Sequence, residues 1–285
     1  IYVTASAELH AINKENGVLE WSVDIEGSSD LIEIDEDKIF VTSSLYEIEV
    51  QDYTETTFFT FDKNGQLLGS VNFEEKPWFM KKQNQKIILG IGRPRCGILT
   101  IDDKYNISHS RTDGNSPVNM GIKTNKRFLL GHSDGTITEI NDSGRKYIQC
   151  GNDSITAISS KDISWQAGDK NGNLFSSDGW SKKLGDRINC IVETKHHIWV
   201  SVTSKNNVVY LLDKGSGSIK HQFSHDYKIQ LMKLLDNNLA ISDEEGKVMF
   251  FDTKTLDKRI GTKSVISEDL ERRNLLKKRL RALRE

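Results

Sequence analysis

The chain has 285 residues, of which 36% are hydrophobic and 28% are charged, and its formal net charge is −2 at pH 7. So small a net charge argues against a protein that binds nucleic acid over its whole surface. No run of eighteen apolar residues occurs, so the sequence predicts no transmembrane segment.

A short phrase recurs along the chain: apolar residues, then Asp or Asn, then a polar turn that usually contains Gly. The Asp or Asn of its seven copies falls at Asn13, Asp62, Asp102, Asn141, Asp178, Asp213 and Asp252. Most copies lie about forty residues apart, which is the length of a four-stranded propeller blade. Asp and Asn suit this position because their side chains bond the backbone two residues on and so start the turn that reverses a strand.

Strands laid between these turns give four strands per unit, from the axis to the rim. The sixth unit is the clearest, with strands expected at residues 188–193, 197–204, 208–212 and 219–223. The seventh unit has strands expected at residues 229–235, 239–242, 248–251 and 256–260. The first unit has only three, at residues 1–4, 9–13 and 19–23, and lacks its innermost strand.

An open sheet edge invites pairing with other chains, so a ring of blades needs the missing strand. We expect residues 263–267 to return and pair with residues 1–4; residues upstream of Ile1 are the alternative source. The sequence thus predicts an all-β fold. Residues 1–266 form a seven-bladed β-propeller of four-stranded blades, and residues 267–285 form a short C-terminal α-helix.

The first unit also carries a family resemblance. Its segment LHAIN at residues 9–13, followed by Gly17 and Trp21, resembles the repeat of the PQQ-like and WD40-like β-propeller superfamily. The resemblance covers the fold of nearly the whole chain and identifies no single family within it. Similar quinoprotein enzymes need calcium ligands and a stacking tryptophan at the centre, and this sequence shows no such set. We therefore expect no cofactor.

In a propeller, the connections between the second and third strands of a blade, and between successive blades, share one face. The sequence places an unusually long acidic connection there at residues 45–57, with Glu47, Glu49, Asp52 and Glu55. A long hairpin extension of this kind is often functional, although a solvated loop is the equal alternative.

Residues on the same face suggest contacts with a partner. Arg93 and Arg95 flank Pro94 in the third unit, and Trp78 lies on the neighbouring connection. Arg187 and Tyr227 lie on later connections. Arginine and aromatic side chains are typical anchors of interfaces, so these five residues are candidate partner-binding residues.

Catalytic and metal-binding signals are weak. His225 and Asp226 lie close to Tyr227, but a His and an Asp near each other are a poor indication of acid–base catalysis by themselves. His196 and His197 are neighbours in a strand and point to opposite faces, so they do not suit one metal ion. No HExxH, Walker loop, nucleophile elbow or GxGxxG is present. We expect no catalytic, cofactor-binding or metal-binding residues.

Residues 267–285 have a helical pattern, with Ser267 as the cap and no Gly or Pro. Their leucine stripe consists of Leu276, Leu280 and Leu283. Their basic residues are Arg272, Arg273, Lys277, Lys278, Arg279, Arg281 and Arg284. Three interpretations stay open: a helix docked on the propeller, a helix that binds a protein partner, and a basic face that binds nucleic acid or an anionic membrane. The leucine stripe and all these basic residues except Arg284 are candidate partner-binding residues.

The repeat framework without catalytic motifs favours a non-enzymatic protein–protein interaction scaffold. Two alternatives remain: an enzyme or small-ligand binder that uses the central funnel, and a cell-envelope assembly factor similar to PQQ-like lipoproteins. Cys96, Cys150 and Cys190 form no CxxC pair, so we expect buried thiols in a reducing, cytoplasmic compartment. The chain begins with Ile1 rather than Met, which leaves a cleaved signal peptide as an alternative.

Overall fold

A computed structural model describes most of the chain. The described residues are 1–5, 7–124, 127–141, 143–161, 163–205, 207–235 and 238–255. The expected strand at residues 256–260, the expected closing strand at 263–267 and the expected basic helix at 267–285 lie outside these residues.

Within the described residues, 26 strands form seven antiparallel sheets, and the fold is a β-propeller with one sheet per blade. The predicted all-β propeller fold is therefore confirmed. The chain divides into two units, Ile1–Lys170 and Asn171–Glu285.

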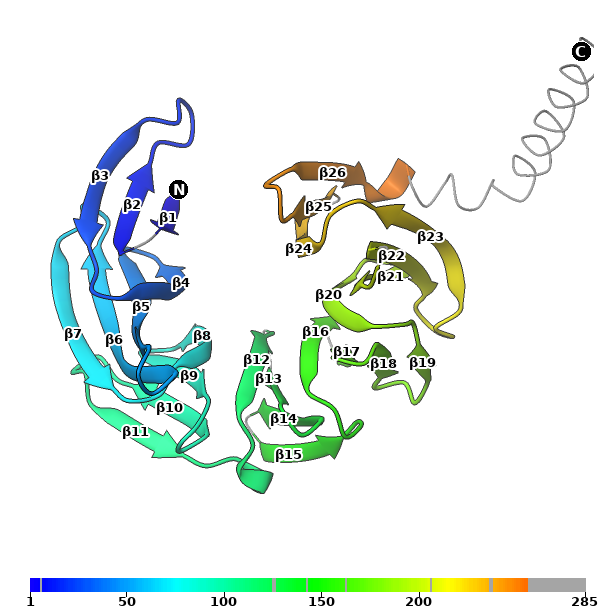
Figure 1. Cartoon of the computed structure of the whole chain (residues 1–285), viewed down its shortest axis with the longest axis horizontal. Coiled ribbons are helices and arrows are strands. Elements are labelled where there is room, and N and C mark those ends of the chain that lie inside the picture. Colours follow the sequence, from blue (N-terminus) through cyan, green and yellow to red (C-terminus); the bar gives the residue numbers. More distant parts are fainter. Residues whose placement is uncertain are drawn as a thin grey trace, which may run out of the picture. The chain divides into compact units, whose positions relative to one another are not determined.

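The first unit holds four sheets and the start of a fifth (Figure 1). The first sheet consists of β1 (Tyr2–Ala5), β2 (Glu8–Ile12) and β3 (Leu19–Asp24). The second consists of β4 (Ser28–Asp35), β5 (Lys38–Glu47), β6 (Asp52–Asp62) and β7 (Leu67–Phe73). The third consists of β8 (Pro77–Gln83), β9 (Lys86–Ile91), β10 (Gly97–Ile101) and β11 (Ile107–Ser110). The short 3-10 turn η1 (Asp113–Asn115) leads to the fourth sheet, β12 (Val118–Lys123), β13 (Arg127–His132), β14 (Thr136–Asn141) and β15 (Gly144–Gln149).

The fifth sheet has the strand order β16-β17-β18-β19, and the unit boundary falls between its second and third strands. Its strands are β16 (Ile155–Lys161), β17 (Ser164–Asp169), β18 (Asn173–Ser176) and β19 (Ser181–Lys183). The sixth sheet consists of β20 (Arg187–Glu193), β21 (His197–Thr203), β22 (Asn207–Asp213) and β23 (Ile219–His225). The last described strands are β24 (Ile229–Leu235), β25 (Asn238–Asp243) and β26 (Val248–Asp252).

The recurring Asp works as the sequence predicts. Asp62 Oδ1 accepts hydrogen bonds from the amides of Asn64 at 2.9 Å and Gln66 at 2.8 Å. Asp102 Oδ1 accepts the equivalent bonds from Lys104 and Asn106, both at 2.9 Å. These bonds satisfy the backbone donors of the turn between the third and fourth strands of each sheet.

Each sheet buries its faces against its neighbours because apolar residues alternate along the strands. A large cluster in the first unit lies between the second and third sheets and contains Phe40, Phe58, Leu89 and Leu99. The innermost strands β4, β8, β12 and β16 contact one another in this order. This packing fixes the connections at the strand ends, where the candidate site lies.

The first described sheet has the order β1-β2-β3, as predicted for a unit without its innermost strand. β1 pairs with β2 on one edge, from Tyr2 opposite Ala11 to Ala5 opposite Glu8. Among the described residues, no strand covers the other edge of β1.

The first and the fifth sheets each carry a rim tryptophan that packs on the next sheet. A Cβ added to Gly65 would lie 2.9 Å from the ring of Trp21, and one added to Gly217 would lie 2.6 Å from the ring of Trp180. Each indole therefore packs directly on a glycine in the next sheet along the chain. Trp180 follows Gly179 directly, whereas Trp21 lies four residues after Gly17, so the two tryptophans do not share one spacing in the sequence.

Candidate partner-binding face of the second and third sheets

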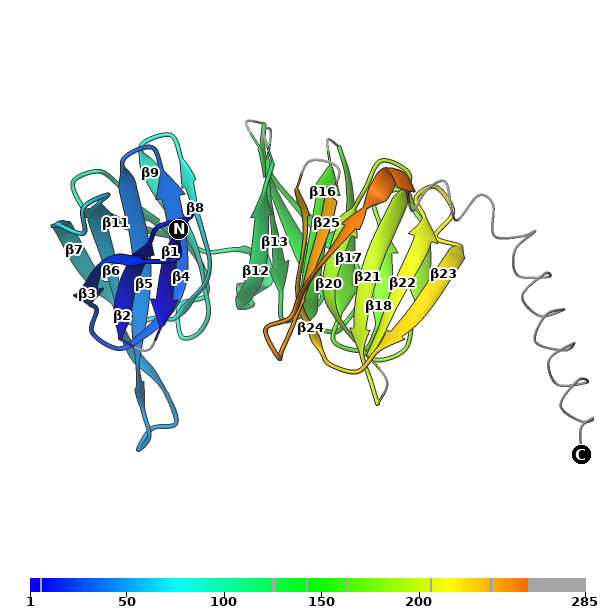
Figure 2. The same ribbon diagram turned by 90° about the horizontal axis from the view of Figure 1, so that it is seen from above.

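Of the two alternatives for residues 45–57, a hairpin extension and a solvated loop, the structure has the hairpin. β5 and β6 stay paired almost to its end, with Leu45 opposite Glu55 and Glu47 opposite Asp52. Only residues 48–51 form the turn. Figure 2 shows this hairpin extending past the other strands of its unit. This pairing, with one register shift between Leu45 and Tyr46, gives the extension a defined direction.

The end of the hairpin, residues 46–52, is termed the hairpin tip. All seven of its residues are exposed. Its large apolar side chains are Tyr46, Ile48 and Val50, which expose 52%, 83% and 58% of their surface. Its acidic residues are Glu47, Glu49 and Asp52. An apolar group this exposed, held on paired strands, is the kind of patch that marks interaction sites.

Buried polar contacts hold the base of the hairpin. Ser44 and Thr56 face each other on β5 and β6, are fully buried, and share a hydrogen bond of 2.9 Å between their hydroxyl oxygens. The Ser44 hydroxyl also donates to Asp30 on β4. Asp30 in turn forms an ion pair of 2.5 Å with Lys76, which lies in the connection from β7 to β8.

Lys76 joins the hairpin to the third sheet. Its ammonium lies 3.6 Å from the ring centroid of Tyr53 and 5.2 Å from that of Trp78. A cation over an aromatic face is attracted by the ring quadrupole, and the attraction grows when the site is shielded from water. Because Lys76 is largely buried, these contacts fix the aromatic side chains relative to each other.

The predicted cluster of Trp78 with the Arg93–Arg95 loop is present. A Cβ added to Gly92 would lie 3.2 Å from the indole nitrogen of Trp78, so the indole lies against the backbone of this loop. Trp78 remains 48% exposed. Arg93 is exposed, and no described residue pairs with it.

Arg95 has a structural partner that the sequence did not indicate. Its Nε donates to Glu75 Oε1 at 2.5 Å and its Nη2 donates to Oε2 at 2.6 Å. Glu75 is completely buried. This two-pronged pair raises the pKa of Arg95 above its ordinary value, chiefly through the hydrogen bonds to Glu75. The Nε and Nη2 groups of Arg95 thus anchor the loop. Its role as a partner contact stays a prediction.

Arg187 and Tyr227 both lie in the second unit. Arg187 begins β20 opposite Thr203, and Tyr227 is 43% exposed. His225 bonds Asp243 through Nε2 at 2.9 Å. The pKa of Asp243 is lowered first by this bond and then by amide bonds from the turn after β25. His225 therefore holds a buried turn carboxylate, and its neighbour Asp226 forms no part of that pair.

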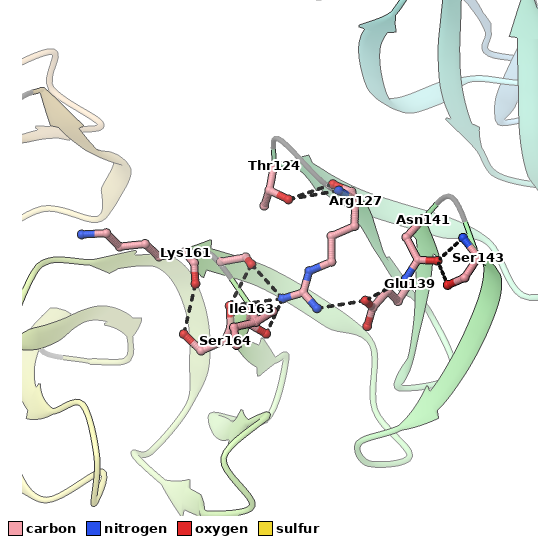
Figure 3. Close-up of polar contacts among 9 residues, drawn as sticks. Thr124, Arg127, Glu139, Asn141, Ser143, Lys161, Ile163 and Ser164 are labelled. Atoms are coloured by element: carbon pink, nitrogen blue, oxygen red, sulfur yellow. Dashed lines mark hydrogen bonds and ion pairs between the residues drawn. The ribbon is translucent and has the colours of Figure 1, made fainter.

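A separate polar network around Arg127 connects the fourth sheet to the fifth (Figure 3). The buried guanidinium of Arg127 donates to Glu139 Oε1 at 2.9 Å and to the carbonyl of Ile163 at 2.6 Å. Arg127 begins the second strand of its sheet, whereas the hairpin tip lies where a second strand ends. This network is a contact between sheets and leaves no charge exposed for a ligand.

Within the part of the chain that the structure describes, no group of three or more His, Cys, Asp or Glu side chains is placed to hold a metal ion. The same described part contains no helix long and apolar enough to cross a membrane. All three cysteines are free thiols. Burial raises the pKa of the Cys150 thiol to about 11, which makes it a poor nucleophile at neutral pH.

These features define a β-propeller fold. The chain is similar to the solved structure of BamB from Moraxella catarrhalis, with 14% identity over 87% of this chain and 79% of that chain and a TM-score of 0.67. It is also similar to the computationally designed Ika8 protein, with 10% identity over 88% of this chain and 95% of that chain and a TM-score of 0.60. The sequence matches no protein-family model and no curated protein. At these identities the similarities establish the fold alone.

Proposed function

We propose that the chain is a non-enzymatic interaction scaffold that binds a protein partner through the hairpin tip. The observation that carries the proposal is the exposure of Tyr46, Ile48 and Val50 at the end of a paired hairpin. The propeller fold and the similarity to BamB support a scaffold or assembly role in general. Such an assembly role is one form of the scaffold proposed here.

The hairpin tip is too small to make a stable interface alone, since a typical interface buries about 800 Å² on each partner. Lys76 connects Tyr53, which pairs with Tyr46 of the hairpin tip, to Trp78, so the contact surface continues to the Arg93–Arg95 loop. Trp and Arg supply the anchors that interfaces favour, and the fixed base lowers the entropy lost on binding. The binding surface therefore runs from the hairpin tip to Arg93.

Affinity purification of the tagged full chain tests this proposal. Ile48→Glu with Val50→Glu places charge in the apolar part of the tip. We expect at least a tenfold lower recovery of any partner that the unchanged chain captures, with an unchanged circular dichroism spectrum.

The matched control is Ile163→Glu, which alters a side chain that is 82% exposed in the turn between β16 and β17, against 83% for Ile48. This variant should retain the partner. Equal recovery by the tip variant and the control would contradict a role for the hairpin.

The finer alternatives stay predictions. Binding of nucleic acid or an anionic membrane falls on the basic residues from Arg272 to Arg284, outside the described residues. The cytoplasmic location and the enzyme or small-ligand alternative also stay predictions.

A further inference from the structure

The charge of the hairpin tip indicates which kind of partner surface can bind it. The sequence from residue 39 to residue 62 contains no Lys or Arg. Among the described residues, no cation forms an ion pair with Glu47, Glu49 or Asp52. The hairpin tip therefore presents exposed apolar side chains that alternate along the chain with carboxylates that no described cation neutralises. A complementary partner carries apolar side chains flanked by cations.

A segment of the same chain has apolar side chains flanked by cations. Residues 272–285 include seven basic side chains and the leucine stripe Leu276, Leu280 and Leu283. With the acids at residues 268, 269, 271 and 285, residues 267–285 have a charge of 7 − 4 = +3, which leaves −2 − 3 = −5 for the rest of the chain. Opposite charges near a protein surface attract, and burial of the leucines against Ile48 and Val50 adds a hydrophobic contribution.

The hairpin tip extends past the other strands of its unit, which presents it to other molecules (Figure 2). Every copy of the chain carries both the acidic tip and the basic segment, so two copies can join through unlike surfaces. We propose that the hairpin tip of one copy binds residues 267–285 of a second copy. This inference rests on the proposed function, because it uses the same tip as a binding surface.

Zero-length carbodiimide crosslinking of the full chain tests the contact directly. Isotope-labelled and unlabelled chains are mixed, and the reagent joins carboxylates to lysines in direct contact. We expect crosslinked peptides that pair Glu47 or Glu49 of one isotope with Lys277 or Lys278 of the other. Crosslinks confined to one isotope, which mean a contact within one copy, would overturn the proposal, and so would their absence.

Charge exchange gives a second test. Glu47→Lys with Glu49→Lys should raise the dissociation constant for self-association at least tenfold in sedimentation equilibrium, and Lys277→Glu with Lys278→Glu should do the same. An equimolar mixture of the two variants should restore association, because the unaltered tip of one variant then meets the unaltered segment of the other, and the altered tip meets the altered segment. Failure of the mixture to associate would overturn the proposal.

The control is Glu15→Lys with Asp103→Lys, which reverses two exposed acids in turns away from the hairpin and should leave association unchanged. The two proposals fail separately. A chain that captures another protein through the tip yet does not self-associate overturns only this inference.

Discussion

At the residue scale, the buried carboxylate of Glu75 depends on a single arginine. Because 40% of the Arg95 side chain is exposed, its loss should cost less than that of a fully buried pair. We expect Arg95→Ala to lower the free energy of unfolding by about 2 kcal/mol, since it leaves Glu75 buried without a counter-charge. Urea denaturation measures the change.

The neighbouring Arg93→Ala is the matched control for Arg95, since it removes an exposed arginine from the same loop. It should change stability by less than about 0.5 kcal/mol. Equal effects of the two variants would mean that the pair with Glu75 contributes nothing to the fold.

Asp243 gives the fold a specific acid sensitivity. Its pKa is lowered by the hydrogen bond with His225, so the ionised form stabilises the folded state above the ordinary pKa of Asp, about 4. This contribution is lost as the pH falls from about 5 through the lowered pKa. We expect the urea midpoint of the unchanged chain to fall more steeply over this range than that of Asp243→Asn. Parallel curves for the two proteins would contradict this assignment.

At the element scale, Gly65 and Gly246 allow a controlled test of the contact between sheets. Both have positive φ, +84° and +81°, and both follow a turn Asp whose carbonyl accepts their amide. Only Gly65 lies against Trp21; nothing lies within 4 Å of a Cβ at Gly246.

Gly246→Ala should cost about 1–2 kcal/mol for the backbone alone. Gly65→Ala should cost a further 1–3 kcal/mol, roughly, because its methyl group overlaps the indole. Thermal unfolding measures both variants. Equal losses would show that Trp21 moves aside without cost.

We expect the closing strand to pair with the edge of β1 that no described strand covers. Ile1 and Ile12 exchange two backbone hydrogen bonds of 2.8 Å. In an antiparallel pair such bonded positions alternate, so the amides of Tyr2 and Thr4 point away from β2. These two amides report whether another strand covers the edge.

If residues 263–267 pair with β1, the amides of Tyr2 and Thr4 exchange slowly with solvent in the full chain. Val265→Pro removes a strand donor and should make both exchange quickly, while the amides of Val3 and Ala5, which point toward β2, stay protected. Nuclear magnetic resonance resolves the four amides. Fast exchange of Tyr2 and Thr4 in the unchanged chain would exclude the closing strand.

The sequence was sufficient to predict the repeating elements but not every contact between them. A turn Asp such as Asp62 acts on its own backbone, so its role can be read locally. At residues 45–57 the sequence left a hairpin extension and a solvated loop open, because both faces of the tip are solvated and the usual alternation of buried and exposed residues is lost. Glu75 with Arg95 and Asp30 with Lys76 are pairs formed across separate connections, and no local pattern indicates them.

At the scale of the whole molecule, many thin sheets supply rigid supports for connections that differ from blade to blade. The predicted cluster of Trp78 with the Arg93–Arg95 loop is present for this reason, since successive sheets bring their connections to one face. The uneven distribution of charge, with an acidic hairpin and a basic segment at residues 267–285, is likewise visible in the sequence. The sequence did not show that contacts of Lys76 and Ser44 fix the acidic hairpin relative to its neighbours.

Site-specific photo-crosslinking in cells tests the central claim most directly. A photoreactive amino acid is introduced at position 48 in the hairpin tip or, as the equally exposed reference, at position 163. The account predicts a crosslinked product with a second polypeptide from position 48 and none from position 163. No product from position 48, or the same product from both positions, would contradict the claim that the hairpin tip is the partner-binding surface.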